Sequence, residues 1–78
     1  MDIDRAIRLV EYAQTCDISD ATRRWVAVGY LAEAADACLP EQLEAAEELR
    51  LERLVLMDDI AHYTPDYASL LARLQALK

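Results

Sequence analysis

Hydrophobic residues recur along much of this chain at the three- and four-residue spacing of one face of an α-helix. In residues 3–15 the repeat consists of Ile3, Ala6, Ile7, Val10 and Ala13. In residues 67–78 it consists of Tyr67, Leu70, Leu71, Leu74 and Leu77. The chain has only one glycine and two prolines among 78 residues, so it has few turn residues. The pattern therefore predicts four helices, the middle two over residues 19–38 and 40–63, joined by short connections.

Polar residues and prolines mark where these helices begin. Ser19 is the predicted N-cap of the second helix, with Asp20 in its first turn. Pro40 suits the start of the third helix, which either continues to residue 63 or breaks at residues 58–59. Residues 64–66 (Thr-Pro-Asp) give the order cap, proline and acid, which predicts the start of the fourth helix.

The predicted fold class is all-α. We expect a small up-down helical bundle of three long helices plus a shorter C-terminal helix, forming a single domain over residues 1–78. The second helix is predicted to lie at the centre, because residues 25–32 carry no charge on any side. Gly29 and several alanines give this helix a thin profile, which lets neighbouring backbones approach closely.

Composition indicates in which cellular compartment the chain is expected and whether it is folded. The sequence is 55% hydrophobic, which argues against disorder, and its longest uncharged run is far too short to span a bilayer. Acids stand at its start, where a secretory segment has positive charge, so we expect a cytoplasmic protein. Cys16 and Cys38 are predicted about 30 Å apart at opposite ends of the second helix, which predicts two free, partly buried thiols.

The acidic residues are unevenly distributed. Ten of the 15 lie in residues 33–66, where Arg50 and Arg53 are the only bases among them, and ten negative charges against two positive ones leave −8 in this stretch. The whole chain carries −7. Such a field repels nucleic acid and anionic membranes and attracts basic protein surfaces, so direct binding to either polyanion is disfavoured.

Candidate sites for chemistry have little support. His62 is the only histidine, and Asp59-x-x-His62 has the spacing used in di-iron bundles. Glu33 is the candidate ligand on the second helix, but the hairpin register places it about 21 Å from Asp59. The single glycine excludes a glycine-rich phosphate loop. We therefore expect no enzymatic activity, no catalytic residues, no metal and no cofactor.

The third helix carries the clearest functional signal. Five of its acids fall within a sector of about 80° at 100° per residue, and Leu51 and Val55 lie in that sector as apolar anchors of the kind that protein interfaces use. The predicted partner-binding residues are Glu41, Glu44, Glu48, Leu51, Glu52, Val55 and Asp59. The alternative is an acidic face that is merely solvated. Arg53 is predicted either to stack on Trp25 of the second helix or to reach solvent along the seam.

These features predict a small acidic non-enzymatic binding protein that docks a basic protein surface through its third helix. Its most concrete form is an inhibitor of a nucleic-acid-handling protein that mimics nucleic-acid phosphates. In class, this resembles the small acidic phage inhibitors known as anti-restriction and anti-CRISPR proteins, although no motif ties the chain to a family. One alternative is a structural homodimer or adaptor formed through the second or fourth helix. A metal-binding bundle ranks third.

Overall fold

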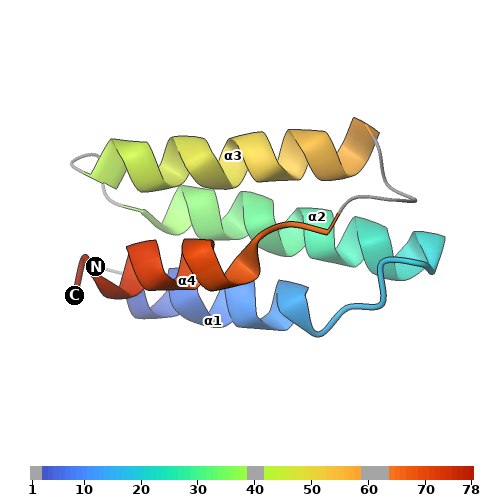
Figure 1. Cartoon of the computed structure of the whole chain (residues 1–78), viewed down its shortest axis with the longest axis horizontal. Helices are drawn as coiled ribbons and strands as arrows, with labels where there is room; N and C mark the ends of the chain where they lie inside the picture. The colour runs from blue at the N-terminus through green and yellow to red at the C-terminus, as the bar shows by residue number, and fades with distance from the viewer. Residues whose placement is uncertain (1–2, 39–41, 59–63) are drawn as a thin grey trace.

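The computed structural model describes residues 3–38, 42–58 and 64–78, which form an all-α helical bundle (Figure 1). Its helices are α1 (Ile3–Gln14), α2 (Ala21–Ala37), α3 (Leu43–Asp58) and α4 (Tyr67–Gln75). They contain 12, 17, 16 and 9 residues, so three longer helices are followed by a shorter one. The predicted fold class is confirmed.

The helices form a ring in which each one has two neighbours. Successive helices run in opposite directions along the long axis, and α4 returns beside α1 (Figure 1). Helix α2 packs on α1 and α3, while α3 and α4 make the smallest contact of the ring. Within the described residues, the diagonal pairs α1–α3 and α2–α4 bring no Cα atoms within 8 Å of each other. The bundle measures 33 × 18 × 18 Å.

Helix α2 does not lie at the centre of the bundle, and that prediction was wrong. With α1 and α3 as its only neighbours among the described helices, it keeps one side toward solvent. Trp25 and Val26 on that side are 55% and 40% exposed. No atom outside the helix lies within 4 Å of where a Cβ on Gly29 would stand. The uncharged run of residues 25–32 is therefore a half-buried helix with an apolar outer side.

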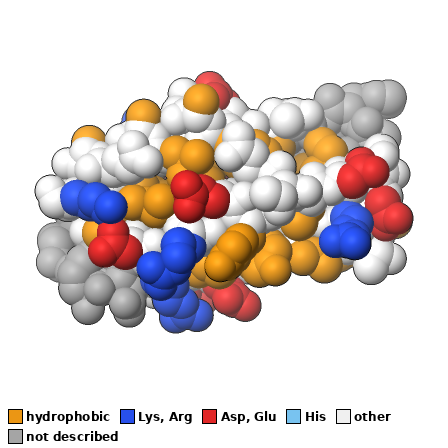
Figure 2. Space-filling model, turned by 90° about the horizontal axis from the view of Figure 1, so that it is seen from below, with side chains coloured by type: hydrophobic (Ala, Val, Ile, Leu, Met, Phe, Trp, Pro, Cys, Tyr) orange, Lys and Arg blue, Asp and Glu red, His pale blue; other side chains and the backbone are white. Residues whose placement is uncertain are grey.

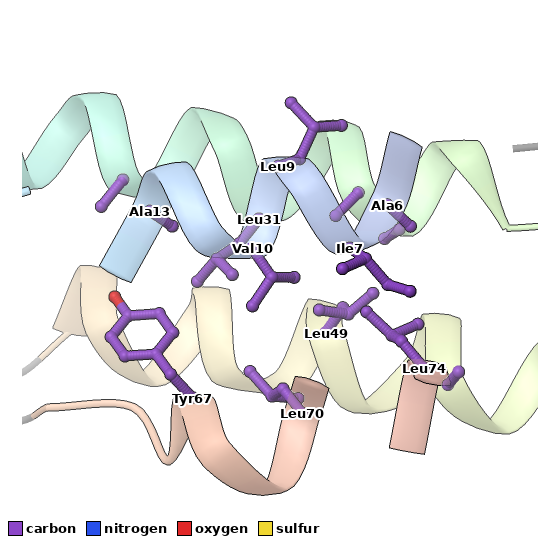
Figure 3. Close-up of a cluster of buried hydrophobic side chains, with 14 of the residues drawn as sticks. Ala6, Ile7, Leu9, Val10, Ala13, Leu31, Leu49, Tyr67, Leu70 and Leu74 are labelled. Carbon is purple, nitrogen blue, oxygen red and sulfur yellow. The ribbon is translucent and has the colours of Figure 1, made fainter. Parts of the chain in front are cut away.

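The core is a column of aliphatic side chains along the bundle axis. All four helices contribute the largest fully buried side chains, which are Val10, Leu31, Leu49, Leu56 and Leu74. Figure 3 shows α1, α3 and α4 directing side chains into this column, with Tyr67 at one end. The buried stripe predicted on α4 is confirmed for Tyr67, Leu70 and Leu74, whereas Leu71 is half-buried and Leu77 is 41% exposed. Burial of each such side chain contributes about 1.5–3 kcal/mol.

The helix starts use different caps from those predicted. Asp20, not Ser19, is the N-cap of α2, and its carboxylate accepts a hydrogen bond of 3.1 Å from the Arg23 amide. Ser19 is engaged elsewhere, because its amide and hydroxyl both donate to Asp17 at 3.0 and 2.6 Å. These hydrogen bonds also hold the pKa of the Asp17 carboxyl below its usual value.

At the start of α4, an aspartate is again the N-cap in place of the predicted residue. Asp66, not Thr64, is its N-cap and accepts hydrogen bonds from the amide and hydroxyl of Ser69 at 3.1 and 2.8 Å. The hydroxyl bond is the main reason that the pKa of Asp66 is lowered. Helix α3 is described as far as Asp58. Its predicted start at residue 40 and its continuation through residues 59–63 lie outside the described residues.

The two cysteines are free thiols at opposite ends of the α2 segment, and both are half-buried, as predicted. Cys16 follows α1, and its Sγ donates to the Tyr12 carbonyl at 3.5 Å. Cys38 ends α2, and burial raises the pKa of its thiol.

Alanine substitutions test whether Asp20 or its neighbour Ser19 caps α2. We expect Asp20→Ala to lower the free energy of unfolding by about 1 kcal/mol, because the Arg23 amide loses its acceptor. Urea unfolding followed by circular dichroism measures this. Ser19→Ala is the control and should cost under about 0.5 kcal/mol, since it removes only an exposed hydroxyl. A larger loss for Ser19→Ala than for Asp20→Ala would contradict the cap assignment.

Tyr67 is the one aromatic ring of the described core, and its hydroxyl has no hydrogen-bond partner there. Burial, together with the nearby Cys16 and Glu52, raises the pKa of this phenol to about 12. A buried hydroxyl without a partner loses its hydration and gains nothing in return.

The variant Tyr67→Phe is therefore expected to be as stable as the natural chain or more stable, by up to about 1 kcal/mol. Thermal and urea unfolding of both proteins measure the difference. Tyr67→Ala is the reference for loss of the ring and should be strongly destabilised, by about 3–5 kcal/mol. A substantial loss of stability in Tyr67→Phe would mean that the hydroxyl does make a stabilising hydrogen bond.

Candidate functional site on helix α3

The structure separates the residues predicted to form the partner-binding stripe. Glu41 and Asp59 lie outside the described residues. Of the other five, Glu44 and Leu51 are exposed, with 92% of the Glu44 side chain and 59% of Leu51 accessible. The remaining three, Glu48, Glu52 and Val55, are half-buried.

Arg73 of α4 offsets part of the negative charge of the predicted stripe on α3. Its guanidinium Nη1 lies 3.9 Å from Glu44 Oε2, and its Nε contacts Glu48 Oε2. Glu52 lies beside Tyr67, where it contributes to the raised pKa of the phenol. The expectation that this stripe is unbalanced within its own molecule is thus only partly met: one cation stands between two glutamates. Glu48 and Glu52 belong to the α3–α4 seam.

The placement of α4 explains this division. The buried side of α3 is formed by Ala45, Ala46, Leu49 and Leu56. The stripe of Glu44, Glu48 and Glu52 lies about a quarter turn from that side, at 100° per residue. Helix α4 packs along this flank, and Arg73 stands in its last turn, where the helix dipole favours a cation.

The surface of α3 that points most directly to solvent carries leucines as well as acids. Leu51 and Leu54 are 59% and 49% exposed, and Glu47 and Asp58 are exposed on the same side. Spacings of three, four and seven residues place these four side chains in one row. Leu54, Glu47 and Asp58 were not among the predicted site residues. Their spacing relative to the buried alanines and leucines was the available signal.

The opposite flank of α3 faces α2. Arg50 Nη2 lies 3.7 Å from Asp36 Oδ1. Together with Ala32 and Arg53, these two residues line a hollow of about 170 Å³. The predicted stacking of Arg53 on Trp25 is not found, because Trp25 makes no ring contact with a cation in the described chain and is largely exposed.

Charges on the side formed by α1 and α4 are interspersed. Figure 2 shows acidic and basic side chains next to one another there, with hydrophobic atoms visible between them. Lys78 Nζ lies 2.9 Å from Asp4 Oδ1, which links α1 to the end of the chain and lowers the pKa of Asp4 through that hydrogen bond. Acidic and basic groups therefore offset one another on this side.

Residues 3–38, 42–58 and 64–78 contain no group of three or more His, Cys, Asp or Glu side chains that could hold a metal ion. Asp59 and His62 lie outside those residues. Glu33, the third candidate ligand, is engaged at 3.7 Å with Arg5. None of the described helices has the length and hydrophobicity that a bilayer span requires.

Comparisons with protein-family models, curated proteins and solved structures give no match to this chain. The function of the chain is therefore inferred from its own residues.

The role of Arg73 can be measured by removing its charge while keeping its aliphatic stem. We expect Arg73→Met to reduce the free energy of unfolding by about 0.5–1 kcal/mol at low salt, because Glu44 and Glu48 are left to repel each other. The loss should shrink in roughly 1 M NaCl, which screens such charges. Arg8→Met, at an exposed arginine of α1, is the control. Equal effects of the two variants would show that Arg73 has no specific stabilising role.

Proposed function

We propose that this chain is a small acidic, non-enzymatic binding protein that docks a basic protein surface with the outward side of α3. The observation that supports this most is the row in which exposed Leu51 and Leu54 stand beside exposed Glu47 and Asp58. Exposed leucines are of no use to a face that only solvates the protein. Apolar anchors within a charged rim are typical of protein interfaces.

The two kinds of residue would contribute differently. Glu44, Glu47 and Asp58 would raise the rate of encounter with a basic surface, an effect that salt weakens within a Debye length of about 8–10 Å. Leu51 and Leu54 would slow dissociation, since each loses water on docking. Val55, Glu48 and Glu52 would act from the α3–α4 seam, by holding the helix in place.

A more specific form of the proposal is inhibition of a nucleic-acid-handling protein by occupation of its basic groove. Glutamates four residues apart on α3 stand about 6 Å apart, whereas duplex DNA carries one charge per about 1.7 Å. The charge density of the helix is thus well below that of the duplex. A mimic built this way depends on its leucines for affinity, and this is consistent with their exposure.

The test exposes the immobilised protein to extracts of host cells at low and at high salt. The captured proteins are identified, and the one that binds most tightly is purified. Binding of that protein should weaken at least about tenfold with Glu47→Lys and with Leu51→Ala, because a steering charge or an anchor is lost. Glu11→Lys changes the net charge equally but lies on α1, so it should bind normally. Duplex DNA should compete if the partner handles nucleic acid.

The proposed function fails if Glu47→Lys and Leu51→Ala bind as the natural chain does, or if Glu11→Lys loses as much affinity as Glu47→Lys. Circular dichroism of each variant confirms that helicity is retained. Charge reversal at Glu48 is unsuitable for this purpose, because it would also break the contact with Arg73.

A further inference from the structure

The outward side of α2 carries large exposed apolar side chains in its first half. Trp25 and Val26 are largely exposed there, and Gly29 follows them one turn later on the same side. A glycine in the middle of a helix weakens it, and no neighbouring group crowds this position. Large exposed apolar side chains around a small residue are what a second helix requires for close approach.

This side also lacks net charge, although the chain carries −7. Its two acids lie in the second half of α2, and each is paired with an arginine of a neighbouring helix. Glu33 lies 3.7 Å from Arg5 of α1, and Asp36 lies 3.7 Å from Arg50 of α3. Two copies of an acidic protein repel each other wherever their acids face, and the neutral side of α2 avoids that repulsion.

The two halves of this side complement each other in shape. The first half carries the bulky Trp25. The second half carries Ala32, seven residues later and therefore on the same flank of the helix. Ala32 borders the hollow of about 170 Å³ that Arg50 and Arg53 also line. The Nε of Arg53 is buried and has no hydrogen-bond partner among the described residues.

We propose that two copies of the chain form a homodimer through α2, antiparallel about a two-fold axis that passes between the two helices at the level of Gly29. Trp25 lies about one turn before Gly29, and Ala32 lies about one turn after it. In an antiparallel pair, Trp25 of each copy therefore faces Ala32 of the other and enters its hollow. There the indole meets the guanidinium groups of Arg50 and Arg53, which favour an aromatic face. A parallel pair would instead place the two indoles together.

The α1-facing flank of α2 is complementary in the same arrangement. Tyr30 packs on Tyr12 of α1 with ring centroids 5.7 Å apart, and Val26 lies one turn before Tyr30. The antiparallel pair places Val26 of one copy against Tyr30 of the other. Arg23 is exposed and makes no ion pair within the described chain. It stands six residues before Gly29, and Glu33 stands four residues after it on the same flank, so in the antiparallel pair these unlike charges lie about 3 Å apart along the helix axis.

A standard interface would use a modest share of the surface. The accessible surface is 4666 Å². A standard interface takes about 800 Å² from each partner, or about a sixth of that surface. This interface is distinct from the outward side of α3 used in the proposed function, so either proposal can fail without the other.

Trp25 is the only tryptophan in the chain, so its fluorescence reports directly on this interface. The 78-residue chain should sediment as a monomer near 1 µM and as a dimer near roughly 200 µM. Over the same range, its emission should shift to shorter wavelength and become protected from acrylamide. A chain that stays monomeric overturns the proposal, and so does a dimer whose tryptophan emission does not change.

Variants identify the helix and the orientation. Trp25→Ala should weaken dimerisation at least about tenfold, and Arg23→Glu should weaken it less. Combining Arg23→Glu with Glu33→Arg should restore part of the affinity, which only an antiparallel pairing explains. Leu51→Ala, on α3, should dimerise normally. The proposal is overturned if Trp25→Ala dimerises as well as the natural chain, if the combined variant is no better than Arg23→Glu, or if Leu51→Ala abolishes the dimer.

Discussion

Four helices sharing one narrow core is the constraint on which the rest of this structure depends. The bundle is only 18 Å across. Each helix therefore points one side at the bundle axis and packs its two flanks against its two neighbours. Leu31, Leu49 and Leu56 occupy the inner positions because a leucine fills that space without a polar group to satisfy. Every charged residue that the structure describes is then confined to a flank or to the outer side, and its surroundings follow from which helix lies beside it.

The flanks show how this constraint distributes charge. On α3, the flank toward α2 carries Arg50, and the flank toward α4 carries Glu48, so one helix presents opposite charges to its two neighbours. On α2, Glu33 pairs with Arg5 of α1, and Asp36 pairs with Arg50 of α3. Ion pairs of this exposure contribute little to stability individually. Their larger effect is on the surface potential, because they leave α2 neutral and keep excess negative charge on α3.

Periodicity was sufficient to predict the helices and most of the core. The buried stripes of α1 and α4 follow directly from spacings of three and four residues, and the fold class follows from having four such segments. The caps could not be assigned in this way. Where two capping residues are adjacent, the choice depends on a local competition, and Asp17 holds Ser19 so that Asp20 caps α2. Propensity alone does not resolve such a pair.

The candidate site was predicted only in part, for a related reason. Helical spacing places Glu44, Glu48 and Leu51 near one another, but it does not say which flank of α3 the fourth helix covers. That choice brings Arg73 to Glu48 and leaves Leu54 outside. The lack of charge in residues 25–32 was equally ambiguous, since an uncharged helix can be enclosed by its own chain or left with one bare side.

The contact between Asp4 and Lys78 has a practical consequence for handling this molecule. Because α1 begins and α4 finishes at the same end of a body 33 Å long, a tether attached at either extremity leaves from that end (Figure 1). The long outer surfaces of α2 and α3 run away from it. A surface-bound or fluorescently labelled molecule therefore presents both of them unobstructed, whichever extremity carries the attachment.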